Sequence, residues 1–158
     1  MTIVVGYVPT ETGFSAIKEA EREAHARDIE VVVVNVVGPA GYTVPNAADE
    51  RNLDAVTAHL TNHGVRNSVR QVVDDASPAD VLLGVAKELD ASLIVLGMHQ
   101  RLWIGRQLLG STAMSVVLAA PCPVLIVPDI DPRRSVSGDG DAPPLRNVGQ
   151  VEDGMSDG

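Results

Sequence analysis

Cysteine, lysine and long apolar runs are all scarce in this sequence. Its single cysteine, Cys122, cannot form an intrachain disulfide or a thiolate metal site, and it agrees with a reducing compartment. Uninterrupted apolar runs such as residues 31–34 are far shorter than the roughly 20 residues that a membrane-spanning helix needs. The N-terminal residues also lack the basic and then apolar segments of a signal peptide. We therefore expect a cytoplasmic protein with no membrane partner.

Positive charge is the other shortage. Twelve Lys and Arg residues stand against 21 Asp and Glu residues, which leaves a formal net charge of −9. This is the wrong sign for a surface that must neutralise several phosphates, so nucleic acid is not an expected partner.

The 158 residues are 45% hydrophobic and 21% charged, which is typical of a globular domain rather than of a disordered or fibrous chain.

The composition changes sharply after Pro128. Residues 129–158 contain five glycines, three prolines, seven acidic residues and three arginines, with only scattered apolar residues. Such a segment buries too little apolar surface to offset the entropy that ordering would cost. We therefore divide the chain into one domain, residues 1–128, and a disordered acidic tail, residues 129–158. The tail is either an interaction segment or a solvated extension with no partner.

Short β-branched runs alternate with longer helical patterns throughout the domain. They predict strands at residues 2–6, 30–36, 65–73, 92–96 and 123–127, and helices at about 12–27, 53–63, 78–89 and 111–120. Ser77 before Pro78 is a strong start signal for the third helix, and Gly64 is a typical residue just past the end of the second. Five strands alternating with four helices predict a parallel sheet covered on both faces, a three-layer α/β/α sandwich.

Two loops that follow strands have an unusual composition. Residues 6–11 follow the first strand, and residues 97–112 follow the fourth. In the second loop, Gly110, Ser111 and Thr112 lead into a helix, so free amides, hydroxyls and the positive helix end would converge on an anion. This is a candidate phosphate site, although the same residues also suit a simple helix cap.

Other residues of the second loop could extend this candidate site. Arg101 and Arg106 either pair with phosphate oxygens through their planar guanidinium donors or are solvated loop residues. His99 is either a ligand contact or an ordinary loop imidazole. The apolar residues 102–104 would cover a ligand, meet a partner subunit or fold back onto the domain.

These motifs together resemble the universal stress protein family. Nucleotide-binding members of that family carry Gly, two residues, Gly, nine residues, and then Gly followed by Ser or Thr. Gly97 matches the first position, Gly110 and Ser111 match the last two, and Gln100 replaces the second glycine. The strand end L-I-V-L-G, the run R-Q-L-L-G-S and the segment A-P-C-P-V-L-I-V are also similar to the family. The resemblance covers residues 2–128.

The resemblance implies a fold and the phosphate side of a site. The fold would be a five-stranded parallel sheet of order 3-2-1-4-5, of the adenine nucleotide alpha hydrolase-like type. Gly97 and His99 would lie beside the ribose and phosphates. Gly110, Ser111 and Thr112 would hold the phosphates.

The resemblance also implies an adenosine side, formed by the first two strand ends. Thr10 aligns with a hydroxyl position of the family beside Pro9, and Val36 or Val37 would match the small apolar residue that packs on adenine. Family members typically place an Asp just after the first strand, where it contacts adenosine, and the aligned residue here is Val8. Gln100 likewise adds a side chain where glycine would let the backbone approach phosphate closely.

The function that the resemblance implies is non-enzymatic binding of ATP or another adenine nucleotide, with or without Mg²⁺, in a stress response. The only two lysines, Lys18 and Lys87, lie in predicted helices, so no Walker lysine is present, and no nucleophile has a recognisable base. Val8 and Gln100 leave open an interaction module of the same fold that binds no nucleotide. A slow nucleotide hydrolase is the third interpretation.

Two further features concern assembly and metals. Residues 123–127 would form an edge strand without a charge to oppose pairing, so we expect a homodimer in which this strand pairs antiparallel with its copy, as in many family members. His59 and His63 are spaced i, i+4 on the second helix and could face one metal ion. The sequence indicates no third ligand, so we expect no metal site.

Overall fold

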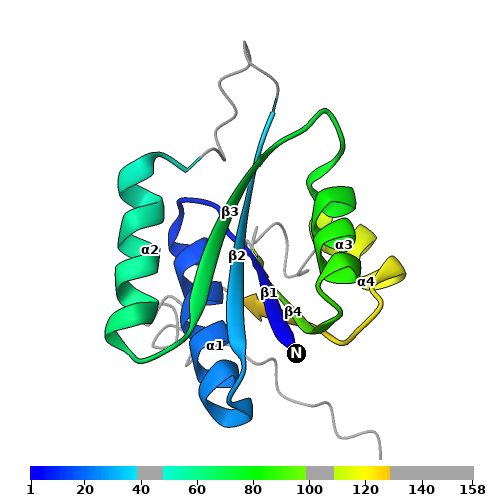
Figure 1. Cartoon of the computed structure of the whole chain (residues 1–158). Helices are drawn as coiled ribbons and strands as arrows, with labels where there is room; N and C mark the ends of the chain where they lie inside the picture. The colour runs from blue at the N-terminus through cyan, green and yellow to red at the C-terminus, as the bar shows by residue number, and fades with distance from the viewer. Residues whose placement is uncertain (39–47, 99–108, 129–158) are drawn as a thin grey trace, which may run out of the picture.

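A computed structural model of the protein describes residues 1–38, 48–98 and 109–128 (Figure 1). The strands are β1 (Thr2–Gly6), β2 (Glu30–Val37), β3 (Asn67–Val73), β4 (Ala91–Met98) and β5 (Val124–Pro128). The helices are α1 (Glu11–Arg27), α2 (Glu50–Asn62), α3 (Pro78–Glu88) and α4 (Ser111–Ala119). None of these helices is long and apolar enough to cross a membrane. The predicted tail and the apolar residues 102–104 lie outside the described residues.

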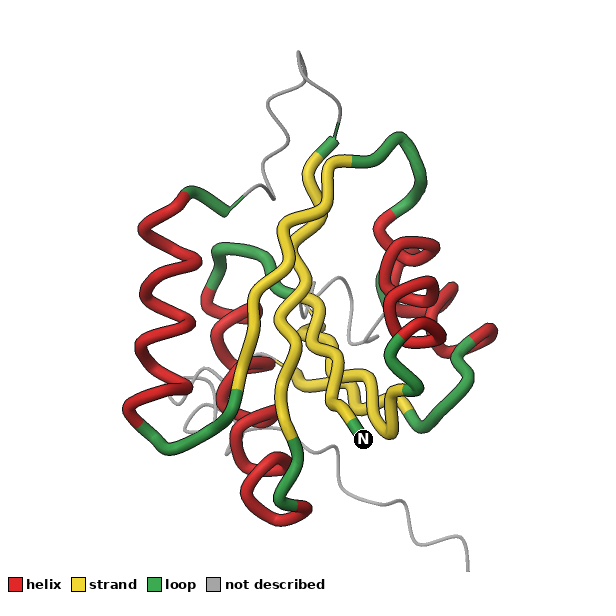
Figure 2. Tube along the Cα trace, in the orientation of Figure 1, coloured by secondary structure: helices red, strands yellow, loops and turns green. Residues whose placement is uncertain are grey.

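The five strands form one parallel sheet in the order β3-β2-β1-β4-β5, which confirms the predicted order. The central strand β1 pairs with β2 on one side and β4 on the other, so that Val4 aligns with Val32 and with Ile94. Helices α1 and α2 lie on one side of the sheet, and α3 and α4 lie on the other (Figures 1 and 2). The fold is therefore the predicted three-layer α/β/α sandwich.

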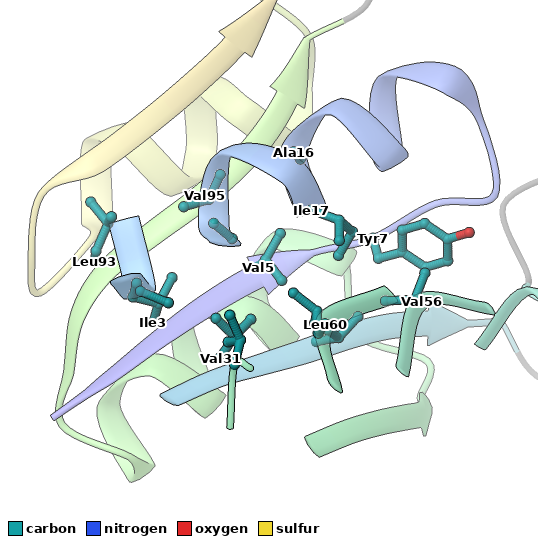
Figure 3. Close-up of a cluster of buried hydrophobic side chains, with 14 of the residues drawn as sticks. Ile3, Val5, Tyr7, Ala16, Ile17, Val31, Val56, Leu60, Leu93 and Val95 are labelled. Carbon is teal, nitrogen blue, oxygen red and sulfur yellow. The ribbon is translucent and has the colours of Figure 1, made fainter. Parts of the chain in front are cut away.

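Alternating strand residues supply the two halves of the core. Ile3 and Val5 of β1 pack with α1 and α2, whereas Val4 between them packs with α3 and α4. Figure 3 shows the first half, in which Ile17 of α1 and Leu60 of α2 meet the strand residues. All five side chains are fully buried, and each contributes about 1.5–3 kcal/mol by leaving water. Burial on both faces explains why the central strands are mostly apolar.

Polar side chains cap three of the four described helices. Thr10, Asp49 and Ser77 each accept a hydrogen bond from the backbone N–H three residues ahead, at the starts of α1, α2 and α3. Each such cap stabilises its helix by about 1 kcal/mol. The Ser77 cap confirms the start signal that the sequence contains for α3. Helix α4 begins after Gly110, which has no side chain to supply this bond.

The connection from α2 to β3 confirms the expected role of Gly64. The Gly64 N–H donates to the Thr61 carbonyl at 3.0 Å, and the Val65 N–H donates to the Leu60 carbonyl at 2.9 Å. Gly64 itself has a φ of 73°, the left-handed backbone that glycine adopts without strain. This paired arrangement is a Schellman motif, and it delays β3 to Asn67, two residues later than predicted. β3 lies at the edge of the sheet, as its irregular pattern indicates.

Candidate functional site

The strand order reverses between β1 and β4. The chain passes from β1 outward to β2 and β3, and then returns to β4 on the opposite side of β1. In open parallel sheets, ligands bind in the crevice that this reversal leaves at the carboxyl ends of the strands. A cavity of about 210 Å³ occupies this place. Its lining consists of Gly6, Tyr7, Val8, Thr12, Gly13, Val34, Val36, Pro78, Leu82, Leu96, Gly97, Thr112 and Ala113.

The walls of the cavity are mainly apolar. Val34 and Val36 come from β2, Leu82 from α3 and Leu96 from β4. Val36 is half-buried, and the other three side chains are buried within the second half of the core. The lining residues within the described part of the chain include no Asp, Glu, His, Lys or Arg. Rigid, uncharged walls of this kind suit a flat, weakly polar group such as a heterocyclic base.

The start of α4 gives the cavity a polar, electropositive end. Thr112 and Ala113 of the first turn line the cavity, and no side chain of the described residues caps this helix. The first four N–H groups of a helix have no partner within it, and the aligned peptide dipoles add partial positive charge there. Gly110 leaves this side of the approach open, since a Cβ at this position would meet no atom of the described residues within 4 Å. This end of the cavity is therefore suited to an anion.

Two glycines bring separate segments into close contact at the cavity. A Cβ on Gly97 would lie 2.6 Å from the carbonyl oxygen of Thr12, and a Cβ on Gly13 would lie 1.8 Å from the carbonyl oxygen of Val8. Real Cβ atoms do not approach oxygen so closely, so both positions require glycine for packing. The Thr10 hydroxyl also acts within the protein, because it accepts a hydrogen bond from the Gly13 N–H at 3.1 Å.

A buried amide fixes the strand ends that form one side of the cavity. Asn35 of β2 is fully buried and donates from Nδ2 to the Tyr7 carbonyl oxygen at 2.9 Å. Its Oδ1 accepts from the Ala48 N–H and from Gln71 Nε2 of β3, both at 3.1 Å. One side chain thereby joins the end of β1, the segment before α2 and the edge strand. The cavity wall at Tyr7 and Val36 is held in place by this network.

Tyr7 has an altered acidity. Its ring is buried beside Val56 and Leu60, and its hydroxyl points away from the centre of the cluster (Figure 3). Burial, and to a smaller extent the negative charge of Asp49, raises the pKa of Tyr7 above its ordinary value of 10.0. The phenol is therefore neutral at physiological pH and does not bring charge to the cavity.

The structure brings several of the predicted site residues together and leaves others apart. Val8, Val36, Gly97 and Thr112 all line the cavity. Pro9 lies in the loop between β1 and α1, and Thr10 caps α1. Gly110 and Ser111 are exposed at the start of α4, next to the lining residue Thr112. His99, Gln100, Arg101 and Arg106 lie outside the described residues.

Sequence reasoning missed other lining residues, notably Gly13, Pro78 and Leu82. Gly13 gives a detectable signal, because glycine is a poor helix former and yet stands within the first turn of α1. Leu82 gives no such signal in the sequence, because its pattern is that of an ordinary core residue of α3. Its place in the cavity depends on how α3 packs against β1 and β4.

The parallel sheet and its strand order, which reverses between β1 and β4, define a doubly wound α/β protein. The sequence matches the universal stress protein family over residues 1–128. The chain belongs to this family, which confirms the resemblance noted from its motifs.

Individual relatives agree with this assignment. A universal stress protein of Mycolicibacterium smegmatis is 35% identical over 125 residues, which cover 79% of this chain and 95% of the relative. The solved universal stress protein from Archaeoglobus fulgidus is 26% identical with a TM-score of 0.71, over 80% of this chain and 98% of that one.

Two further solved structures contain nucleotides. The universal stress protein from Archaeoglobus fulgidus in complex with dAMP is 25% identical with a TM-score of 0.63, over 80% of this chain and 97% of that one. A universal stress protein in complex with cAMP is also 25% identical, with a TM-score of 0.66, over 82% of this chain and 98% of that one. Both ligands are adenine nucleotides.

Proposed function

We propose that the cavity between β1 and β4 binds an adenine nucleotide and that the protein acts in a stress response as a nucleotide-binding protein. The observation that carries this proposal is that an apolar cavity, with no charged group among its described lining residues, meets the start of α4, which no described side chain caps. An adenine base suits the first part, and a phosphate suits the second. The dAMP and cAMP complexes of two similar proteins support the choice of adenine.

The proposed orientation follows from the two ends of the cavity. The base would pack on Val36, and the phosphates would meet Gly110, Ser111 and Thr112. Charge-assisted hydrogen bonds to a phosphate contribute about 1.5–3 kcal/mol each, so the α4 end would supply much of the affinity. Gly97 would lie beside the ribose. We propose ATP with Mg²⁺ as the bound nucleotide. We also propose that the protein is cytoplasmic.

Binding without turnover is the proposed activity. Hydrolysis needs a positioned base or a water-orienting group within reach of the phosphates. Among the lining residues that the structure describes, the groups with a hydroxyl are two threonines and Tyr7, and the Tyr7 ring packs in the half of the core beneath α1 and α2. This composition supports a nucleotide-binding protein rather than a nucleotide hydrolase.

A homodimer is the proposed assembly. β5 is the outermost strand on its side of the described sheet, and its residues are half-buried. Next to it, α4 exposes Met114, Val117 and Leu118, and Leu118 is 78% exposed. Antiparallel pairing of β5 with its copy would bring both apolar α4 surfaces toward the two-fold axis.

The same apolar surface favours a second candidate function, an interaction module that binds no nucleotide. Val8, which occupies the cavity where family members typically place an Asp, points in the same direction. Under this alternative the cavity is only a feature of the fold, and the surface formed by α4 and β5 is the one that interacts with a partner.

Calorimetry separates these functions. The full chain would be titrated with ATP, ADP, AMP and cAMP, with and without Mg²⁺, up to millimolar concentration. Saturable heat with at least one adenine nucleotide, and none with the matching guanine nucleotide, is the expected result. Absence of heat with all four would overturn nucleotide binding and leave the interaction module. A single-turnover assay with ATP, expected to show no phosphate release, tests the third interpretation.

A further inference from the structure

Three metal-ligating side chains meet between α1 and α2. Glu21 of α1 lies beside His59 of α2, with 2.6 Å between Glu21 Oε2 and His59 Nε2. His63, one turn further along, completes a group in which one ligand atom from each residue lies within 4.8 Å of the others. Glu21 is separated from His59 by 38 residues, so the histidine spacing alone could not indicate this third group.

The two histidines are already arranged as a pair. His59 lies in the last turn of α2 and His63 is the residue that caps its end, and their ring centroids lie 4.4 Å apart. His63 Nδ1 lies 2.6 Å from the carbonyl oxygen of His59. A carbonyl can only accept, so Nδ1 carries the proton and Nε2 is the basic nitrogen. A metal-bound histidine usually makes this same kind of bond through its other nitrogen.

The surroundings favour an ion that is partly removed from water. The side chains of His59 and Glu21 are only 19% and 16% exposed, and the ring of Phe14 meets the His59 ring edge-on at 5.1 Å. The Lys18 ammonium lies 5.3 Å from the centroid of the Phe14 ring. His63 is exposed and gives an ion access from solvent.

We propose that Glu21, His59 and His63 form a Zn²⁺ site. Two imidazoles and one carboxylate are a common zinc donor set, with the fourth tetrahedral position taken by water. Donors around a tetrahedral zinc lie about 3.3 Å apart, given metal–ligand distances of roughly 2.0–2.2 Å. The Glu21–His59 contact therefore opens slightly on binding, and the exposed His63 side chain closes in. The ion would link α1 to α2 where the two helices face each other.

This site is separate from the cavity of the proposed function. None of its three residues lines the cavity, and the cavity lies at the carboxyl ends of the strands. Zinc binding and nucleotide binding can therefore succeed or fail independently.

Metal titration of the stripped full-length chain tests the proposal. Isothermal calorimetry with Zn²⁺ is expected to show one ion per chain with micromolar or tighter affinity, and Zn²⁺ is expected to raise the thermal midpoint. Co²⁺ is expected to produce the strong visible absorption of a tetrahedral complex.

Matched variants assign the ligands. H63A and E21Q are expected to weaken Zn²⁺ binding by about tenfold or more and to remove the thermal shift. H25A removes an exposed histidine of α1, and C122S removes the only thiol, so both are expected to bind as the parent does. Absence of zinc binding, or binding that H63A leaves unchanged, would overturn the site. Destabilisation by E21Q with no effect of zinc would show that Glu21 and His59 form only an ion pair.

Discussion

Gly97 at the end of β4 lies directly against Thr12 in the first turn of α1. A Cβ on Gly97 would be 2.6 Å from both the Thr12 carbonyl oxygen and its Cγ2. Thr12 is buried, and its carbonyl belongs to the backbone of α1, so neither atom can move aside easily. The first glycine of the family motif is therefore required by the packing of β4 on α1.

Replacement of Gly97 by alanine should destabilise the fold. Overpacking a well-packed position costs about 1–3 kcal/mol, and the clash here involves backbone. Urea unfolding of G97A should show this loss in the free energy of unfolding. The control is G84A, at an exposed position of α3 where a Cβ meets nothing, which should gain about 0.5–1 kcal/mol. Equal stabilities of G97A and G84A would contradict the contact.

Gly110 allows phosphate binding to be separated from folding. A side chain fits there without a clash, and both Asp and Asn are good residues at a helix start. G110D should therefore keep or slightly raise stability while its carboxylate repels the phosphates and removes measurable nucleotide binding. G110N has nearly the same shape without the charge, so it should retain most of the affinity. Calorimetry with ATP checks both, and equal binding by the two variants would place the phosphates elsewhere.

The fold could be predicted from the sequence because its signals are local. The apolar runs of the strands, the Ser77 cap and the Gly64 turn each depend on residues within a few positions, and the structure confirms them. The strand order needed the family resemblance, since periodicity alone does not say which strands are neighbours.

The site was less predictable because its parts meet only after folding. The pattern identified Gly97 and Thr112 but gave no sign that Gly97 packs on Thr12. The family resemblance implies a ligand role for Thr10, and it gives no sign that the same hydroxyl accepts the capping bond of α1. Glu21 was missed beside His59 for the same reason, because the contact joins two helices that are distant in sequence.

Asn35 should be among the most sensitive polar residues. N35A would leave the Tyr7 carbonyl, the Ala48 N–H and a Gln71 amide N–H without their present partner in a buried site. Loss of such a network should lower the free energy of unfolding by about 2–4 kcal/mol. Chemical denaturation measures this loss. N62A, at an exposed position of α2, is the control and should change stability by less than about 0.5 kcal/mol.

Tyr7 should make stability fall at high pH. Its pKa is raised in the folded protein from 10.0, by burial first and then by Asp49, so the folded state holds this proton more tightly than the unfolded chain does. The contribution is fully present below about pH 10 and is lost as the pH rises toward the raised pKa. Y7F should remove this part of the pH dependence. The other tyrosine of the chain is Tyr42, so in Y42F the tyrosinate absorbance reports Tyr7 alone, and a midpoint at the ordinary value would contradict the shift.

Leu118 on α4 should contribute to self-association. Its side chain is 78% exposed and lies one helical turn from Met114, beside the edge strand β5. L118K would place two like charges near the two-fold axis and remove a leucine that the proposed dimer would bury, which should weaken the dimer about tenfold or more. V73K introduces the same charge at a 66% exposed apolar residue of β3, at the opposite edge of the sheet, and should leave the dimer intact. Sedimentation velocity over a micromolar range measures the dimerisation of the parent chain and of both variants. Pairing through β5 and α4 is contradicted if the parent chain is monomeric throughout, or if the two variants dimerise equally.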